Sequence, residues 1–460
     1  MNNSQQEKNP RLYLNHLFRY QKIYLCILLL VLSTTPLVLN YLHEKPVLVG
    51  GESYYYLSSA QQESPYNPLT LLFKIIPDKL SFLLPPLISL GIVILFYAFA
   101  EKIKLSEKRT FFIVLFYLLT PSFIFTSLTL SSYSLYLLLI LSGANLLFSD
   151  GRKRYFSIIP LLLASFIDTF CTVLLLAGIV VHFYILNRSK ERFHTLLTIS
   201  IATVLILNAV VLNTPFFIGP FQIQNRASDL ISDLGGFSGV GFFSLLLAFI
   251  GLIISWQKKN LPLMIPAVLI FLAAYLFNTH TVFFLSILIV ILAAASFEYL
   301  LEQTWKISFL RNAVLLLLLL GISFSAVSYM ERLSEYSPTS VDQKTLEWIQ
   351  RNTPEEAIIL SAPENSYYIS YFAQRKPLFA LHHDYQQQYN LSQHIFNAYY
   401  INELFPLLEQ NDVSIIYISD KMKHTLPKEQ EFLFLLQNER FKMLYFTEDT
   451  EVWSFEEAKQ

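Results

Sequence analysis

An acidic residue follows a pair of glycines shortly after the first long apolar run of the chain. Gly50 and Gly51 precede Glu52, and Tyr54 and Tyr55 follow it. A carboxylate beside a flexible glycine pair can act as a general base on an acceptor hydroxyl or amide. It can also hold a divalent cation, Mg²⁺ or Mn²⁺, against a phosphate, because hard cations prefer oxygen ligands. The third interpretation is a solvated acid in a loop whose tyrosines lie at a membrane interface.

A second candidate lies between Pro215 and Gly239, where Arg226, Asp229 and Asp233 stand among apolar residues. A planar guanidinium can pair two oxygens of one phosphate, so Arg226 is a candidate clamp for a lipid-linked phosphate, with Asp229 beside it. The alternative is an ion pair between Arg226 and Asp229 within the loop, which contributes little at a surface.

Membrane-spanning helices are the elements that must position these residues. The chain of 460 residues is 54% hydrophobic and only 15% charged, and its apolar residues are concentrated in long runs. Each run can cross a hydrocarbon core of about 30 Å. The clear runs are 23–42, 82–100, 111–129, 130–148, 195–213, 240–256, 261–277, 282–301 and 312–330.

The stretch from Ser157 to Leu186 is too long for one ordinary span and short for two. Basic residues occur on both sides of it, at 152–154 and at 188–192, and the positive-inside rule places such short basic loops in the cytoplasm. Both flanks are cytoplasmic only if the stretch forms a hairpin of two short spans that turns near Asp168. The sequence therefore predicts about 11 spans, with a cytoplasmic N-terminus and a C-terminal segment on the opposite side.

The chain is expected to have three parts. They are a cytoplasmic N-terminal segment 1–22, a transmembrane domain 23–330 with outer loops 43–81 and 214–239, and an extracytoplasmic α/β domain 331–460. Helix and strand patterns alternate in the last part, which is typical of an α/β domain. Helices are expected at 341–352, 391–410 and 428–439, and strands at 357–361, 378–381, 413–419, 441–446 and 451–455. No glycine-rich turn follows a strand, so no nucleotide-binding fingerprint is present.

The residues of the first outer loop and of the tail resemble the GT-C superfamily of membrane glycosyltransferases. Glu52, with Tyr54 and Tyr55, falls on the acidic motif of the first outer loop in that superfamily. In the tail, Leu346–Ile349, Asn352–Leu360 and Tyr367–Arg375 are similar to the catalytic subunit of archaeal oligosaccharyltransferase. The resemblance covers nearly the whole chain and implies a GT-C-like fold and use of a polyprenyl-phosphate sugar carrier.

The chain departs from this family in three places. The tryptophan-tryptophan-aspartate-tyrosine-glycine motif that recognises the acceptor sequon would fall on Ala362–Ser366, where it is absent. Gly51 stands beside Glu52 where many members carry a second acid. The connection Ser127–Ser134 has no carboxylate for a second metal-binding motif.

The resemblance implies an integral protein of the cell membrane that is a glycosyltransferase. It would move a sugar from a polyprenyl-phosphate-linked donor to an extracytoplasmic lipid or protein acceptor, with membrane lipid but no nucleic acid as a partner. Glu52 would be the catalytic base or a metal ligand, with Mg²⁺ or Mn²⁺ as the cofactor. Tyr54, Tyr55, Arg226 and Asp229 would bind substrate. The alternative is a catalytically inactive GT-C-fold protein that acts as an accessory or lipid-carrier-binding subunit, which the missing second acid favours.

Overall fold

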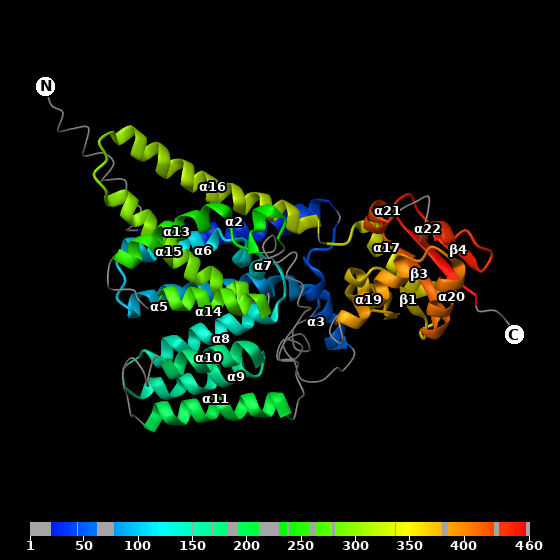
Figure 1. Ribbon diagram of the computed structural model, residues 1–460, viewed down its shortest axis with the longest axis horizontal. Coiled ribbons are helices and arrows are strands. Elements are labelled where there is room, and N and C mark those ends of the chain that lie inside the picture. Colours follow the sequence, from blue (N-terminus) through cyan, green and yellow to red (C-terminus); the bar gives the residue numbers. More distant parts are fainter. Residues whose placement is uncertain are drawn as a thin grey trace. The chain divides into compact units, whose positions relative to one another are not determined.

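The protein folds as two compact units, each described here by itself (Figure 1). Unit 1 comprises Met1–Pro36 and Phe82–Leu333, and unit 2 comprises Leu37–Ser81 and Ser334–Gln460. Unit 2 thus includes the described residues 45–61 and 78–81 of the outer loop 43–81. The computed structural model describes residues 20–43, 45–61, 78–149, 151–167, 169–181, 192–210, 230–236, 239–257, 264–277, 281–335, 337–379, 385–426 and 432–456.

Apolar helices follow one another through unit 1 in the order that the sequence predicts. The run expected at 111–129 is a pair of helices, and the ambiguous stretch after Ser157 is two short ones. The helices are α2 (Gln21–Leu42), α5 (Leu84–Lys102), α6 (Glu107–Leu118), α7 (Pro121–Leu128), α8 (Ser132–Leu147), α9 (Ile158–Ser165), α10 (Thr169–Val180), α11 (Arg192–Val210), α13 (Phe242–Gln257), α14 (Met264–Phe277), α15 (Val282–Glu302) and α16 (Ser308–Glu335).

Among the described residues, 4 helices are long and apolar enough by themselves to cross a membrane: Gln21–Leu42, Leu80–Lys102, Val282–Glu302 and Ser308–Leu333. Helices α6 and α7 pass the same test only when they are taken together, as a broken span or a re-entrant loop, and they bend by 64° where Thr120 caps α7 and Pro121 begins it. Shorter apolar helices occur within α8, α11, α13 and α14. The protein is thus a polytopic α-helical membrane protein.

Helices α9 and α10 pack as the two arms of a hairpin. At the turn, Thr172 Oγ1 donates to the carbonyl oxygen of Ser165 at 3.1 Å. Farther from the turn, Leu161 and Ile179 belong to one buried cluster. Because residues that lie progressively farther from the turn on each side still pack together, the two helices are antiparallel. The expected break near 168 is confirmed, although Asp168 itself lies outside the described residues.

A five-stranded sheet forms the centre of unit 2. Strands β2, β1 and β3 are parallel, whereas β5 is antiparallel to both β3 and β4. The strands are β1 (Ile358–Leu360), β2 (Lys376–Pro377), β3 (Val413–Ile418), β4 (Phe441–Phe446) and β5 (Glu451–Phe455), in the spatial order β2-β1-β3-β5-β4. The α/β class predicted for the tail is confirmed.

The helices of unit 2 lie around this sheet, except α3, which packs on α18 and η8 (Figure 1). They are α3 (Gly51–Gln61), α17 (Ser340–Asn352), α18 (Ser366–Tyr368), the π-helix η8 (Ile369–Ala373), α19 (Tyr385–Phe396), α20 (Ile401–Gln410), α21 (Asp420–Thr425) and α22 (Phe432–Leu435). Leu404 and Leu408 of α20 pack with Ile416 of β3 in one buried cluster. The apolar face of α20 therefore supplies part of the core.

Two expected elements of the tail differ from the observed ones. The strand expected at 378–381 is instead Lys376–Pro377, and it pairs with β1. Proline has no N–H to donate, so the ladder is short and β2 stays at the edge of the sheet. The helix expected at 428–439 is Phe432–Leu435 within the described residues.

Helix α17 is fixed to the sheet through one carboxylate. Thr339 and Asp342 form a capping box at the start of the helix, which satisfies backbone N–H groups that the first turn leaves unpaired. The other oxygen of Asp342 accepts a hydrogen bond from the buried hydroxyl of Tyr417 in β3 at 2.5 Å. Burial, and then the charge of Asp342, raise the pKa of Tyr417 well above its usual value, so it remains a donor.

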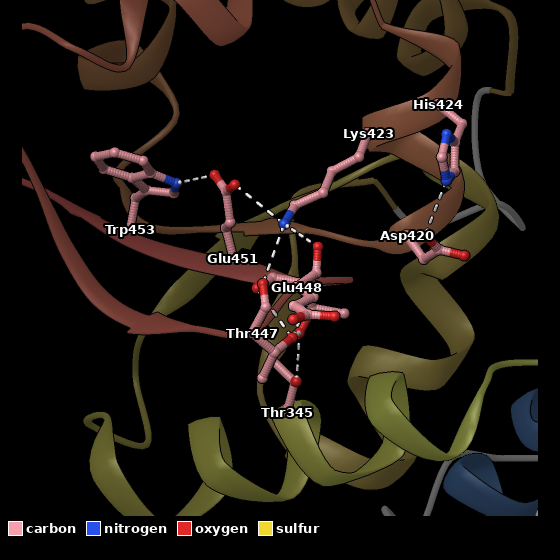
Figure 2. Close-up of polar contacts among 9 residues, drawn as sticks. Thr345, Asp420, Lys423, His424, Thr447, Glu448, Glu451 and Trp453 are labelled. Atoms are coloured by element: carbon pink, nitrogen blue, oxygen red, sulfur yellow. Dashed lines mark hydrogen bonds and ion pairs between the residues drawn. The ribbon is translucent and has the colours of Figure 1, made fainter.

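Polar contacts also tie the β4–β5 hairpin to α21 (Figure 2). Lys423 donates to the backbone carbonyls of Thr447 and Glu448 at 3.3 and 3.0 Å. The same ammonium lies 3.1 Å from one oxygen of Glu451, whose other oxygen accepts from the indole of Trp453 at 3.0 Å. Because Lys423 and Glu451 are mostly covered, this pair holds the hairpin more firmly than a solvated pair would.

Candidate functional site

Glu52 lies in the first turn of α3, the helix that follows the glycine pair. Gly50 has a φ of 78°, a left-handed conformation that side chains other than glycine rarely adopt. The chain turns there and the helix begins at once: Ser53 N donates to Gly50 O at 3.2 Å, and Ser53 Oγ donates to Val49 O at 2.7 Å. The glycine pair therefore sets where the carboxylate stands.

The Glu52 carboxylate is partly exposed and has a tyrosine as a neighbour. Tyr56, one helical turn later, donates its hydroxyl hydrogen to Glu52 Oε1 at 3.4 Å. The positive end of the helix dipole also favours a negative charge in the first turn. A general base or a cation ligand requires the carboxylate in its ionised form.

Tyr54 is the anchor of α3. It is 3% exposed, and its hydroxyl donates to the carbonyl oxygen of Leu48 at 2.9 Å. Burial raises its pKa well above the usual value, so the phenol keeps its proton and remains a donor. A side chain so covered positions the helix and presents almost no surface to a ligand.

Aromatic rings of α18 and η8 form the surface onto which Tyr54 packs. The centroid of the Tyr54 ring lies 5.3 Å from Tyr368, 5.3 Å from Tyr371 and 5.2 Å from Phe372. Tyr55 makes an edge contact with Tyr367 at 5.6 Å. Tilted and edge-on pairs at these distances stabilise beyond the area that they bury.

Gly51 also permits the aromatic rings to pack closely on α3. A Cβ added at Gly51 would lie 2.7 Å from Cδ2 of the Tyr367 ring, closer than real Cβ atoms approach. An aromatic ring thus lies over Gly51, the residue beside Glu52. We call α3, α18 and η8 together the acidic-loop platform.

The sequence matches no family model and no curated protein. Among solved structures, it is similar to the oligosaccharyltransferase of Archaeoglobus fulgidus. The structure of that protein tethered to an acceptor peptide containing the NVT sequon has a TM-score of 0.59 and 12% identity, and the match covers 89% of this chain and 70% of the other. The apo structure has a TM-score of 0.61 and 11% identity, and the match covers 88% of this chain and 70% of the other. A complex with Zn and sulfate has a TM-score of 0.57 and 12% identity, and the match covers 87% of this chain and 68% of the other.

The fold is the GT-C fold. At such low identity the likeness shows the fold alone, and it confirms the fold class that the sequence predicted. Within the described residues of this fold, the acidic-loop platform brings together a carboxylate, a helix N-terminus and a dense aromatic cluster.

The aromatic part of the platform carries a π-helix, a rare element that often marks functional sites. η8 ends at Ala373, and Gln374, which caps it, has a φ of 49°. Arg375 follows, and it is 7% exposed. Its guanidinium donates to the carbonyl oxygens of Gln350 at 2.7 Å and Thr353 at 2.6 Å, and its Nε donates to Thr353 Oγ1 at 3.2 Å. Arg375 thus joins the C-terminal end of α17 to the end of η8.

Replacing Arg375 with Met should lower the free energy of unfolding of unit 2 by about 3 kcal/mol, because buried carbonyls lose charge-assisted donors. Arg375→Lys keeps the charge but not the fork, and should lose about half as much. Chemical unfolding followed by tryptophan fluorescence measures this, since Trp348 and Trp453 report from unit 2. Equal stability of wild type and Arg375→Met would show that the carbonyls find other donors.

The second sequence-predicted candidate is only partly visible. Arg226 and Asp229 lie outside the described residues. Asp233, nearer the end of the same loop, accepts from Ser325 Oγ at 2.5 Å and from the backbone N–H of Phe242 at 2.6 Å. It therefore fastens the loop end to α16 and to the first turn of α13, and its carboxylate is engaged in that task.

A divalent cation needs several oxygen or imidazole ligands around one point. Within the described part of the chain, no group of three or more His, Cys, Asp or Glu residues is placed to hold a metal. The connection between α7 and α8 is lined by buried hydroxyls, Ser127, Thr129 and Ser131 among them. Glu52 alone does not make a cation site from the residues described.

The aromatic partners of Tyr54 and Tyr55 were missed from the sequence. Tyr367, Tyr368, Tyr371 and Phe372 recur at a spacing of one and four residues, which places rings along one side of a helix. That spacing was a usable signal for an aromatic helical face. It carried no information about which part of the chain the face contacts.

Proposed function

We propose that the protein is a membrane glycosyltransferase that moves a sugar from a polyprenyl-phosphate-linked donor to an extracytoplasmic acceptor, either lipid or protein. The GT-C fold supports this proposal, because the similar A. fulgidus structures are those of an oligosaccharyltransferase, one of them tethered to an acceptor peptide. The observation that carries it is the placement of Glu52 on a helix that a buried tyrosine and an aromatic cluster hold in one position.

Glu52 is the general base in this proposal. Its carboxylate accepts the proton of an acceptor hydroxyl or amide as that oxygen or nitrogen forms a bond to the anomeric carbon. The bond from this carbon to the donor phosphate breaks, and the phosphate leaves with the electron pair. Arg226 steadies the phosphate as its negative charge grows. Asp229 and Tyr55 contact substrate, whereas Tyr54 positions α3.

A divalent cation, if it were bound, would stabilise the negative charge that grows on the leaving phosphate. The described residues supply Glu52 as one ligand and do not supply a full set, so the proton transfer above is assigned to Glu52 alone. The segment Ala362–Ser366, on which the sequon-recognition motif would fall by the sequence resemblance, has another sequence and forms the turn η7 (Pro363–Asn365) and the start of α18. We therefore propose an acceptor other than a sequon.

An inactive accessory subunit that binds the lipid carrier is the second candidate. Two sequence features favour it: Gly51 stands beside Glu52, and the α7–α8 connection has no carboxylate. Purified protein in lipid, incubated with a panel of labelled polyprenyl-phosphate sugars, separates the candidates. Transfer of label to a lipid or protein fraction supports the enzyme, and binding of labelled donor without transfer supports the accessory subunit.

The proposed topology places residues 331–460 outside the cytoplasm and residues 1–22 inside it. Single cysteines introduced at the exposed positions Glu403 and Lys442, in a chain whose Cys26 and Cys171 are replaced by Ala, should react with a membrane-impermeant thiol reagent in intact cells. A cysteine at Lys108 should react only after permeabilisation, because basic loops stay in the cytoplasm. Labelling of the Lys108 site alone in intact cells would show that the protein has the opposite orientation in the membrane.

A further inference from the structure

An apolar cavity of about 320 Å³ lies in unit 1 among α8, α10, α14 and α15. Tyr136 of α8 lines it, and so does Phe148, which caps the C-terminal end of this helix. At 1.5 Å for each of the 12 residues between these positions, the cavity follows the helix for about 18 Å. Gly178 of α10 lines it as well, and a Cβ added there would meet no atom within 4 Å. Apolar cavities exclude water and accept apolar ligands. In a membrane helix bundle the available ligand is a hydrocarbon chain.

A basic and aromatic segment follows α8 directly. η2 (Gly151–Ser157) carries Arg152 and Lys153, both exposed. Tyr155 and Phe156, the next aromatic residues, are 50% and 61% exposed. Cations beside exposed aromatic rings are typical of a segment that lies at the membrane interface among anionic headgroups.

Arg154 fixes the orientation of this segment. Its guanidinium lies 5.5 Å from the centroid of the Tyr155 ring and 5.6 Å from that of Phe193, which belongs to α11. Cation–π contacts at these distances hold the segment against the bundle. Phe148, which lines the cavity, is three residues from Gly151. The cationic segment therefore begins where the cavity reaches the end of α8.

We propose that the cavity and η2 together bind one anionic phospholipid. One hydrocarbon chain of the lipid occupies the cavity, and the phosphate pairs with Arg152 and Lys153. In the proposed topology η2 is cytoplasmic, so this lipid belongs to the inner leaflet and is separate from the sugar donor, whose phosphate lies on the outer side. The site does not depend on transferase activity.

Native mass spectrometry of the purified full chain, titrated with phosphatidylglycerol or phosphatidylcholine, tests this site. Two interfacial cations should give the wild type about a tenfold preference or more for phosphatidylglycerol. Arg152→Gln with Lys153→Gln should reduce the preference to about one. Gly178→Phe should reduce retention of both lipids, because the ring fills the space of the chain, whereas Gly178→Ala should retain them.

Lys108→Gln with Lys306→Gln is the matched control, since both residues are exposed and basic and lie in other loops of unit 1. This pair should keep the preference for phosphatidylglycerol. An equal loss of lipid preference in the control pair would show that η2 is only one part of a general basic surface. Undiminished lipid binding by Gly178→Phe would show that the hydrocarbon chain does not occupy the cavity. Far-ultraviolet circular dichroism and gel filtration identify any variant that fails to fold, and Gly178→Leu then replaces Gly178→Phe.

Discussion

Replacing Glu52 with Gln should lower sugar transfer by about a hundredfold or more, the usual scale for loss of a positioned acid or base. Glutamine keeps the size of the side chain and can still accept a hydrogen bond from Tyr56. The helix α3 should therefore form as before. What the variant loses is the negative charge, and with it the ability to take a proton from the acceptor. The measurement is initial-rate transfer with whichever labelled donor the wild type uses.

Glu403→Gln is the matched control for this experiment. Glu403 also lies in the first turn of a helix of unit 2, α20, and it is exposed. The same chemical change there should leave transfer at the wild-type rate. Wild-type transfer by Glu52→Gln would show that Glu52 is a solvated acid that takes no part in the proton transfer. That result, or the absence of any transfer by the wild type, would favour the accessory-subunit candidate.

The membrane helices were predictable because each is specified by its own residues. A run of about 20 apolar side chains determines a span whatever its neighbours are. The hairpin of α9 and α10 required one further step, the sign of the charges at 152–154 and 188–192. Strands β4 and β5 were predicted at their observed limits, since alternating apolar residues and the turn between them are local signals.

The acidic-loop platform was not predictable in the same way. Its contacts join Tyr54 to Tyr368 and Phe372, more than 300 positions later in the chain. No local periodicity records such a pairing, so Tyr54 was interpreted as an interfacial, substrate-binding residue. The position of the short strand β2 was predicted wrongly for a related reason. Lys376 and Pro377 have low strand propensity, and they pair with β1 because η8 and Arg375 place them beside it.

Replacing Tyr54 with Ala should lower the free energy of opening of α3 by about 3 to 5 kcal/mol, the range for truncating a buried aromatic side chain. The variant loses three ring contacts and leaves a cavity against Tyr368 and Tyr371. Tyr54→Phe keeps the ring and loses only the hydrogen bond to Leu48 O, so it should cost about 1 kcal/mol. Hydrogen exchange across residues 51–61 measures the opening of the helix.

The comparison of these two variants also tests how Tyr54 contributes to the proposed reaction. If the aromatic contacts position Glu52, transfer should fall steeply in Tyr54→Ala and remain close to the wild-type rate in Tyr54→Phe, in proportion to the exchange rates. Tyr400→Ala, a truncation of an exposed tyrosine in the same unit, should change neither quantity. Loss of transfer in Tyr54→Phe with normal exchange protection would mean that the hydroxyl itself acts on substrate, because the ring contacts that hold α3 would be intact.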